Sequence, residues 1–166
     1  MARALGISVH TGWGACVVVG GSLRRPEIIA NQVVRLLGDA ERFCYHMAAD
    51  MPREAAAQWI ERTRRRAIEN ARQALATLLD GQVSVCAVVA KAGSAGDLDT
   101  VLAAHPRIHT AEGCLYRDAF CAASPVPVQV IAPSSLDITQ VGKLAGPPWG
   151  RDQKLAALAA WRALAT

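Results

Sequence analysis

Two apolar runs joined by a short turn open the chain and constrain its fold more than any other segment. Residues 5–21 are rich in valine and carry no charge apart from His10, and the turn lies around residues 10–14. Runs of β-branched residues on both sides of a short turn predict a β-hairpin. A similar run over residues 27–37, preceded by a turn at residues 24–26, predicts a third strand in the same sheet.

Helical spacing replaces the strand pattern after residue 39. Phe43 and Met47 lie four residues apart and Asp39 is placed to cap a first turn, so we expect a helix that ends before Pro52. A long helix is predicted over residues 52–79, where apolar side chains recur every three or four positions.

Strands and helices alternate in the second half of the chain. Residues 83–90 form an almost unbroken apolar run, which predicts a strand covered on both faces. The other expected elements are a short helix from Asp97 to before Pro106, a helix over residues 110–123 capped by Thr110, a strand over residues 126–132, a helix start near Ser134, and a closing helix over residues 152–165. The order β-β-β-α-β-α-β-α predicts a three-layer α/β domain, a mixed five-stranded sheet with helices on both faces.

Composition indicates one globular domain over residues 1–166, because 52% of the residues are hydrophobic and 19% are charged. The net charge of +4 permits attraction to phosphates without requiring it. Five cysteines without a two-residue spacing indicate buried, reduced thiols and a cytoplasmic protein. No stretch approaches the ~20 apolar residues that span a bilayer, so we expect no export signal and no membrane partner.

This order of elements resembles the ribonuclease-H-like fold, and within it the chain is similar to RuvC-type junction resolvases. Gly6-Ile7-Ser8 falls where those proteins have Gly-Ile-Asp, and residues 141–146 and 151–154 are similar to the segment that leads into their last, acid-bearing helix. The resemblance implies a fold whose nucleases hold two divalent ions with several carboxylates.

Most of those carboxylates are missing from this sequence. The first-strand position is Ser8, the fourth strand ends at Lys91 with no acid before Asp97, and Asp152 keeps a matching carboxylate. One carboxylate does not neutralise two magnesium ions, so a two-metal magnesium site and phosphodiester cleavage are disfavoured. Asp152 is the candidate metal ligand, and the alternative that we favour is a cap or first-turn acid of the closing helix.

Histidines are the candidates for acid-base catalysis. His109 and Glu112 can approach each other at the start of a helix, where a carboxylate orients an imidazole, and His10 or His46 could complete the site. Capping of the helix by Thr110 and Glu112 is the alternative interpretation. Because Pro106 lies beside His105, we do not expect His105 and His109 to share one regular helix face.

Two groups of residues are candidates for ligand binding. His10, Thr11, Lys91 and the start of the helix at Thr110 are expected to face one cleft beyond the carboxyl ends of the strands. Arg62, Arg65 and Arg66 form a cluster that could contact nucleic-acid phosphates. A solvated helix face, with Glu61 paired to Arg65, is the alternative that we favour for this cluster.

Two functional hypotheses follow. The leading one is a ribonuclease-H-like domain without two-metal nuclease activity that binds nucleic acid, a nucleotide or a protein. The alternative is a small hydrolase or transferase that uses the histidines with Glu112. A homodimer formed through the alanine-rich residues 155–164 is a further expectation, although burial within one chain explains that apolar face equally well.

Overall fold

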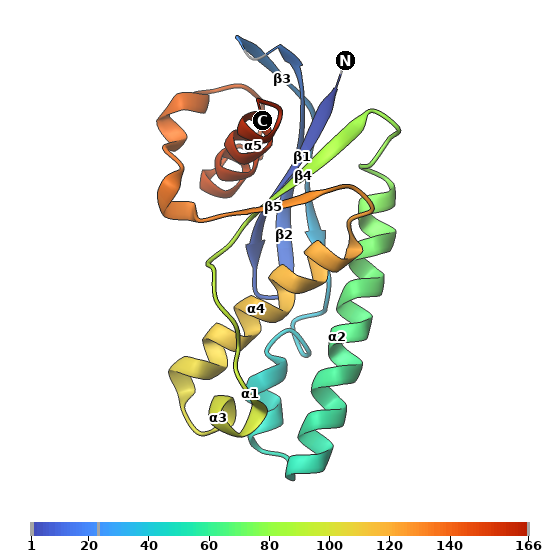
Figure 1. Cartoon of the computed structure of the whole chain (residues 1–166), viewed down its shortest axis with the longest axis vertical. Helices are drawn as coiled ribbons and strands as arrows, with labels where there is room; N and C mark the ends of the chain where they lie inside the picture. The colour runs from blue at the N-terminus through green and yellow to red at the C-terminus, as the bar shows by residue number, and fades with distance from the viewer. Residues whose placement is uncertain (1, 23, 166) are drawn as a thin grey trace.

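A five-stranded mixed sheet forms the middle layer of the protein (Figure 1). The computed structural model describes residues 2–22 and 24–165. The strands are β1 (Arg3–His10), β2 (Trp13–Ser22), β3 (Arg25–Arg35), β4 (Val83–Val89) and β5 (Val128–Ile131), in the spatial order β3-β2-β1-β4-β5. The first three strands are antiparallel neighbours, whereas β4 runs parallel to β1 and β5 runs parallel to β4. The predicted sheet is confirmed, with β4 between β1 and β5.

The opening hairpin turns tightly at Thr11 and Gly12. His10 pairs with Trp13 in the ladder, and Gly12 has a φ of 85°, a left-handed conformation that glycine adopts without steric cost. The carbonyl of Gly12 accepts a hydrogen bond from the amide of Leu36, which joins the hairpin to the end of β3. The turn therefore fixes His10 at the carboxyl end of β1.

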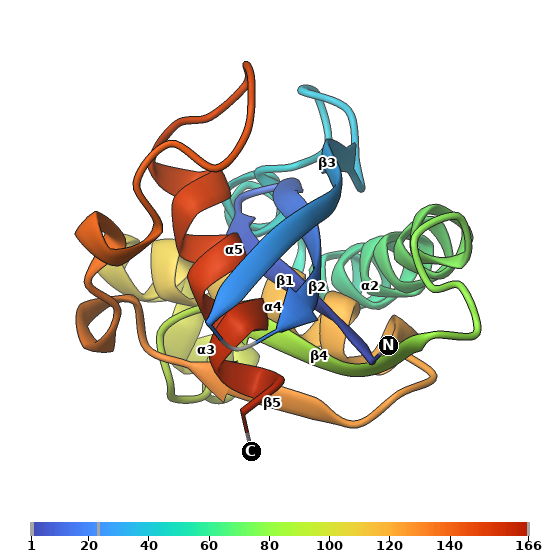
Figure 2. The ribbon, with the colours of Figure 1, turned by 90° about the horizontal axis from the view of Figure 1, so that it is seen from above.

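Helices cover both faces of the sheet. The helices α1 (Cys44–Ala49), α2 (Arg53–Ala76), α3 (Leu98–Leu102) and α4 (His105–Ala123) gather on one side, and α5 (Arg151–Ala163) packs on the other. Figure 2 shows α2 and α5 on opposite sides of the strands. Two short 3₁₀ helices, η1 (Pro133–Ser135) and η2 (Ile138–Val141), lie between β5 and α5. None of the described helices combines the length and the apolar character needed to cross a bilayer.

Successive side chains of the strands point to opposite faces of the sheet and contribute to two hydrophobic cores. Leu5, Ile7 and Cys16 point toward α2 and α4, whereas Ala4 and Val17 point toward α5. Both cores are made of buried side chains, with partly buried apolar residues packed around them. The sheet therefore holds α4 and α5 in fixed positions at its carboxyl edge.

Small residues let α5 approach β1 closely. Ala156, Ala159 and Ala160 are fully buried, and Gly6 of β1 lies directly under the backbone of Ala156. The alanine-rich face that suggested a homodimer is therefore buried against the chain's own sheet, as the alternative interpretation expected.

Two helix starts differ from the sequence-based prediction. A turn occupies residues 39–41, so the helix expected from Asp39 begins only at Cys44. The helix expected from Thr110 begins five residues earlier, at His105, and the hydroxyl of Thr110 donates to the carbonyl of Pro106 instead of capping. Pro106 lies in the first turn of α4, where its missing N–H leaves no helical hydrogen bond unmade.

Candidate functional site

A pocket of about 520 Å³ opens at the carboxyl ends of β1 and β4, between the N-terminus of α5 and the first half of α4. Ligands of doubly wound α/β folds gather at this edge of the sheet. The residues that line the pocket include Ser8, His10, Thr11, Lys91, His109, Thr110, Arg151 and Asp152. The structure thus brings together the four groups that the sequence analysis assigned to one cleft.

Asp152 lies at the centre of a hydrogen-bonded group in this pocket. Its Oδ1 atom lies 2.8 Å from Nε2 of His10 and accepts from the hydroxyl of Ser8 at 3.2 Å. The ring of His10 also stacks on Trp13, with the ring centroids 4.2 Å apart. Because a carboxylate only accepts, Nε2 of His10 carries the proton in this contact.

Asp152 is a first-turn acid of α5, one of the two forms of the alternative that we favoured, and it is not the cap. Gly150 is the N-cap residue of α5, and its amide donates to the side-chain oxygen of Gln153. Asp152 belongs to the first turn of α5, and its carboxylate points to β1. Ser8 and His10 both bind the same oxygen of Asp152, an arrangement that differs from a nucleophile triad, in which the serine binds the histidine.

Positive charge dominates the pocket lining. Lys91 and Arg151 form no ion pair within the described parts of the chain, and Asp152 is the one carboxylate among the lining residues. The loop that carries Lys91 is held by Arg117, whose guanidinium donates to the carbonyls of Lys91 and Gly93 at 3.0 and 2.8 Å. The arrangement can accept an anion more readily than a pair of divalent cations.

The arginine cluster of α2 lies outside this pocket. Arg65 pairs with Glu61 at 2.8 Å, and Arg66 pairs with Glu41 at 2.6 Å. The guanidinium of Arg62 lies over the ring of Trp59, 5.7 Å from its centroid. These contacts match the solvated helix face that was the favoured interpretation of the cluster.

A second polar group is centred on Glu112, whose side chain is only 1% exposed. Its Oε1 atom accepts from Nδ1 of His46 at 2.8 Å and from the backbone amide of His46 at 3.3 Å. Its Oε2 atom is buried and has no hydrogen-bond partner among the described residues. The expected partnership of Glu112 with His109 is therefore wrong, because Glu112 faces into the protein and binds His46 instead.

The charge of Glu112 acts on its neighbours. Burial, followed by the negative charge of Glu112, raises the pKa of the Cys44 thiol to about 12. Burial and the nearby Cys44 and Glu112 also raise the pKa of Tyr116, whose hydroxyl donates to the carbonyl of Arg42. Both groups stay neutral near pH 7, so neither supplies an anionic nucleophile.

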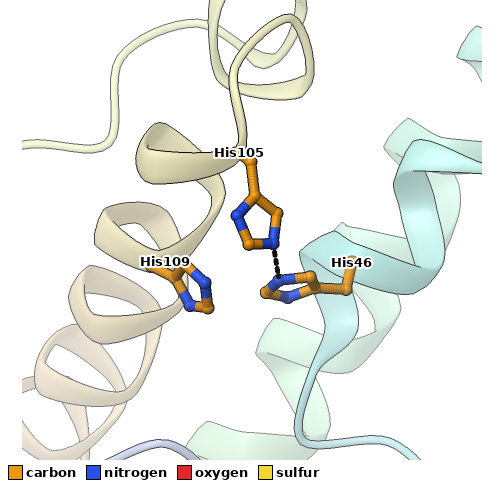
Figure 3. A group of neighbouring side chains, drawn as sticks. All are labelled: His46, His105 and His109. Carbon is orange, nitrogen blue, oxygen red and sulfur yellow. Dashed lines mark hydrogen bonds between the residues drawn. The ribbon is translucent and has the colours of Figure 1, made fainter.

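Three of the four histidines meet beside Glu112. The ring centroids of His105 and His109 lie 4.6 Å apart. The ring centroid of His46 lies 5.0 Å from that of His105 and 4.7 Å from that of His109. Figure 3 shows His105 and His109 extending from α4 toward His46 of α1. The Nε2 atoms of His46 and His105 lie 3.1 Å apart. Within the described ranges this is the one group of at least three side chains able to share a metal ion.

Sequence reasoning missed this cluster because it treated Pro106 as a barrier. A proline in the first turn leaves the helix intact, so His105 and His109, four residues apart, lie on one face of α4. The signal was present in the His-x-x-x-His spacing. The contribution of His46 comes from a distant helix and had no local signal.

Comparisons relate the fold to RuvC. Thermus thermophilus RuvC in complex with a Holliday junction substrate aligns with a TM-score of 0.52 at 15% identity, over 97% of this chain and 91% of that chain. A further Thermus thermophilus RuvC structure aligns with a TM-score of 0.50 at 13% identity, over 96% and 91% of the two chains. No family model and no curated protein matches. The expected RuvC-like, ribonuclease-H-like fold is confirmed, and at these identities the likeness concerns the fold alone.

Proposed function

We propose that this chain is a ribonuclease-H-like domain that binds nucleic acid through its phosphate groups and does not use two-metal nuclease chemistry. The observation that carries the proposal is the charge of the pocket at the ends of β1 and β4. Lys91 and Arg151 line it without ion-pair partners among the described residues, and Asp152 is already engaged by Ser8 and His10.

The chemistry of the lining suits phosphate oxygens. Lysine and arginine supply the charge that replaces condensed counterions, and the hydroxyls of Thr11 and Thr110 can donate hydrogen bonds. The N-terminus of the 13-residue helix α5 also faces this pocket and contributes a positive partial charge.

Nucleic acid is favoured over a free nucleotide or a protein partner. The aligned RuvC structure has the same fold and is a complex with a Holliday junction, a substrate rich in phosphate groups. The net charge of +4 also favours long-range attraction to a polyanion. Aromatic side chains that could stack on a single base are scarce in the pocket lining.

The proposed absence of two-metal cleavage rests on the donor set. Two magnesium ions need several anionic oxygens, and the first-strand position that carries an aspartate in RuvC-type nucleases is Ser8 here. Lys91, two residues beyond the end of β4, adds positive charge to the pocket lining and would repel a bound cation. Asp152 alone would leave most of the charge of two ions uncompensated.

Binding is tested by fluorescence anisotropy with labelled four-way junction, duplex and single-stranded DNA over a range of salt concentrations. We expect Lys91→Glu and Arg151→Glu each to weaken binding about tenfold and to lower the salt slope by about one. Arg72→Glu makes the same charge change on the exposed face of α2 and should change the affinity less than about twofold.

Three results would overturn the proposal. The first is that the wild-type protein binds none of the three DNA forms. The second is an equal loss of DNA affinity in Lys91→Glu, Arg151→Glu and Arg72→Glu. The third is magnesium-dependent cleavage that Asp152→Asn abolishes. A salt-independent affinity for a protein would instead identify a protein-interaction module.

A second candidate function rests on the His46–Glu112 pair. A buried carboxylate that accepts from Nδ1 orients Nε2 of His46 for proton transfer, as in hydrolases and transferases. Turnover of ester or phosphate-ester substrates that is abolished by His46→Gln and retained by His10→Gln would support this function. Equal turnover in wild type and His46→Gln would exclude it.

A further inference from the structure

We propose that His46, His105 and His109 form a mononuclear site for Zn²⁺ with an open coordination position. The proposal does not depend on the phosphate-binding role proposed for Lys91 and Arg151, although His109 also lines their pocket. The ligand set is three imidazoles, which suit zinc and similar first-row cations and not magnesium.

The three ligand atoms are already close to the spacing that zinc requires. One ring nitrogen from each histidine lies within 4.8 Å of the other two. Nε2 of His46 and Nε2 of His105 lie 3.1 Å apart, and two nitrogens at tetrahedral positions around zinc are separated by about 3.3 Å. The ring nitrogen of His109 has to come closer to the other two to complete the set, and its side chain is exposed.

Two rigid elements hold the cluster. His105 and His109 lie one turn apart on α4, and His46 lies on α1, which packs against α4 (Figure 3). Glu112, one turn further along α4, reaches back to His46. The sequence His105-x-x-x-His109-x-x-Glu112 thus places two ligands and a supporting carboxylate on one helix.

Glu112 sets the tautomer of His46. Because its carboxylate accepts from Nδ1, that nitrogen carries the proton and Nε2 keeps the lone pair that faces the other two rings. Zinc-bound histidines commonly donate their second nitrogen to a carboxylate in this way. The second carboxylate oxygen of Glu112, Oε2, is buried and has no hydrogen-bond partner among the described residues.

The fourth coordination position faces outward. His105 and His109 are exposed, and the side chain of His46 is 29% exposed. Three protein ligands with a solvent-accessible fourth position are typical of zinc sites that bind water or a substrate group. His109 also lines the 520 Å³ pocket, so an anion in that pocket lies next to the proposed metal.

Isothermal titration of the metal-stripped protein, residues 1–166, with ZnCl₂ in the presence of a phosphine reductant tests the proposal. We expect one zinc ion per chain and no binding heat with MgCl₂. His46→Ala, His105→Ala and His109→Ala should each lower the affinity at least 100-fold. Glu112→Gln should lower it 10- to 100-fold, because the supporting carboxylate is lost.

His10→Ala is the matched control, because it removes the fourth histidine of the chain and should leave the zinc affinity unchanged. Cobalt(II) supplies a second readout, since intense visible absorption reports tetrahedral coordination that the His105→Ala variant should lack. His105 is exposed in the first turn of α4, so its replacement is the variant least able to disturb folding.

Zinc binding that survives in His105→Ala and His109→Ala would overturn the proposal, and so would a loss of the same size in His10→Ala. Absence of zinc binding by the folded wild type would overturn it as well. If His105→Ala loses zinc binding and keeps the DNA affinity of the wild type, the zinc proposal is supported and the metal site acts independently of the proposed nucleic-acid site.

Discussion

A Cβ atom placed on Gly6 would lie 1.8 Å from the carbonyl oxygen of Ala156. Gly6 belongs to β1 at the middle of the sheet, and Ala156 belongs to the second turn of α5. The contact sets the distance between the helix and the strand, and it therefore sets how Asp152 meets Ser8 and His10. The glycine of the Gly-Ile-Ser segment is required by packing.

Gly6→Ala should destabilise the protein by about 3 kcal/mol, because the added methyl group forces α5 away from the sheet. Gly113→Ala is the control: an added Cβ meets nothing within 4 Å there, and alanine in the helix α4 should stabilise by about 1 kcal/mol. Urea denaturation measures both. Equal midpoints for the two variants would contradict the close approach of β1 and α5.

Asp152→Asn should strengthen binding of duplex DNA about threefold to fivefold, because it removes the pocket's carboxylate and its repulsion of phosphate. Glu54→Gln, which neutralises an exposed acid on α2, should have a smaller effect. Anisotropy titrations at low salt measure the difference. Weaker binding by Asp152→Asn would indicate that the carboxylate holds a cation that the nucleic acid requires.

His46→Ala should destabilise the metal-free protein by about 2 kcal/mol, because it leaves the buried carboxylate of Glu112 without its imidazole partner. Adding Glu112→Gln to that variant should recover part of the loss, since an amide is easier to bury than a charge. A double-mutant cycle by urea denaturation in EDTA measures the coupling. Strict additivity would show that the two side chains do not interact.

Cys121 should be the first thiol to react in the native protein. It is partly exposed, whereas the other four cysteines are buried. Burial also raises the pKa of Cys44 and of Cys86 to about 12, so neither forms the reactive thiolate between pH 7 and pH 9. Alkylation followed by mass spectrometry gives the order. Rapid labelling that persists in Cys121→Ser would contradict it.

Zinc at 100 times its dissociation constant should raise the free energy of unfolding by about 2.7 kcal/mol. For a chain of this length that corresponds to a rise in Tm of about 5–10 °C. His109→Ala should show no such rise, whereas His10→Ala should behave like the wild type. A zinc-dependent shift of the same size in His109→Ala would indicate binding elsewhere.

The fold could be predicted from the sequence because its elements have strong local patterns. The valine-rich hairpin, the apolar strand β4 and the regular spacing of α2 each identify an element without reference to distant residues. The sequence-based prediction missed the start of α4 because it took Pro106 as a helix end. A proline usually ends a helix, but the first helical turn tolerates it, and Pro106 lies in that turn.

Several residues that line the pocket could also be predicted from the sequence. The parallel β1 and β4 end at one edge, so His10 and Lys91 had to lie near each other. The absence of aspartate at residue 8 needed no structure to recognise.

Tertiary packing alone decided which charged and imidazole groups meet. Asp152 faces β1 because Gly6 lets α5 lie close to the strand, and Glu112 is buried because α1 covers α4. His46 and His105 are 59 residues apart in the chain, yet their Nε2 atoms lie 3.1 Å apart. Such contacts follow from how helices pack, and the periodicity of a single segment carries no information about the rotation of one helix against another.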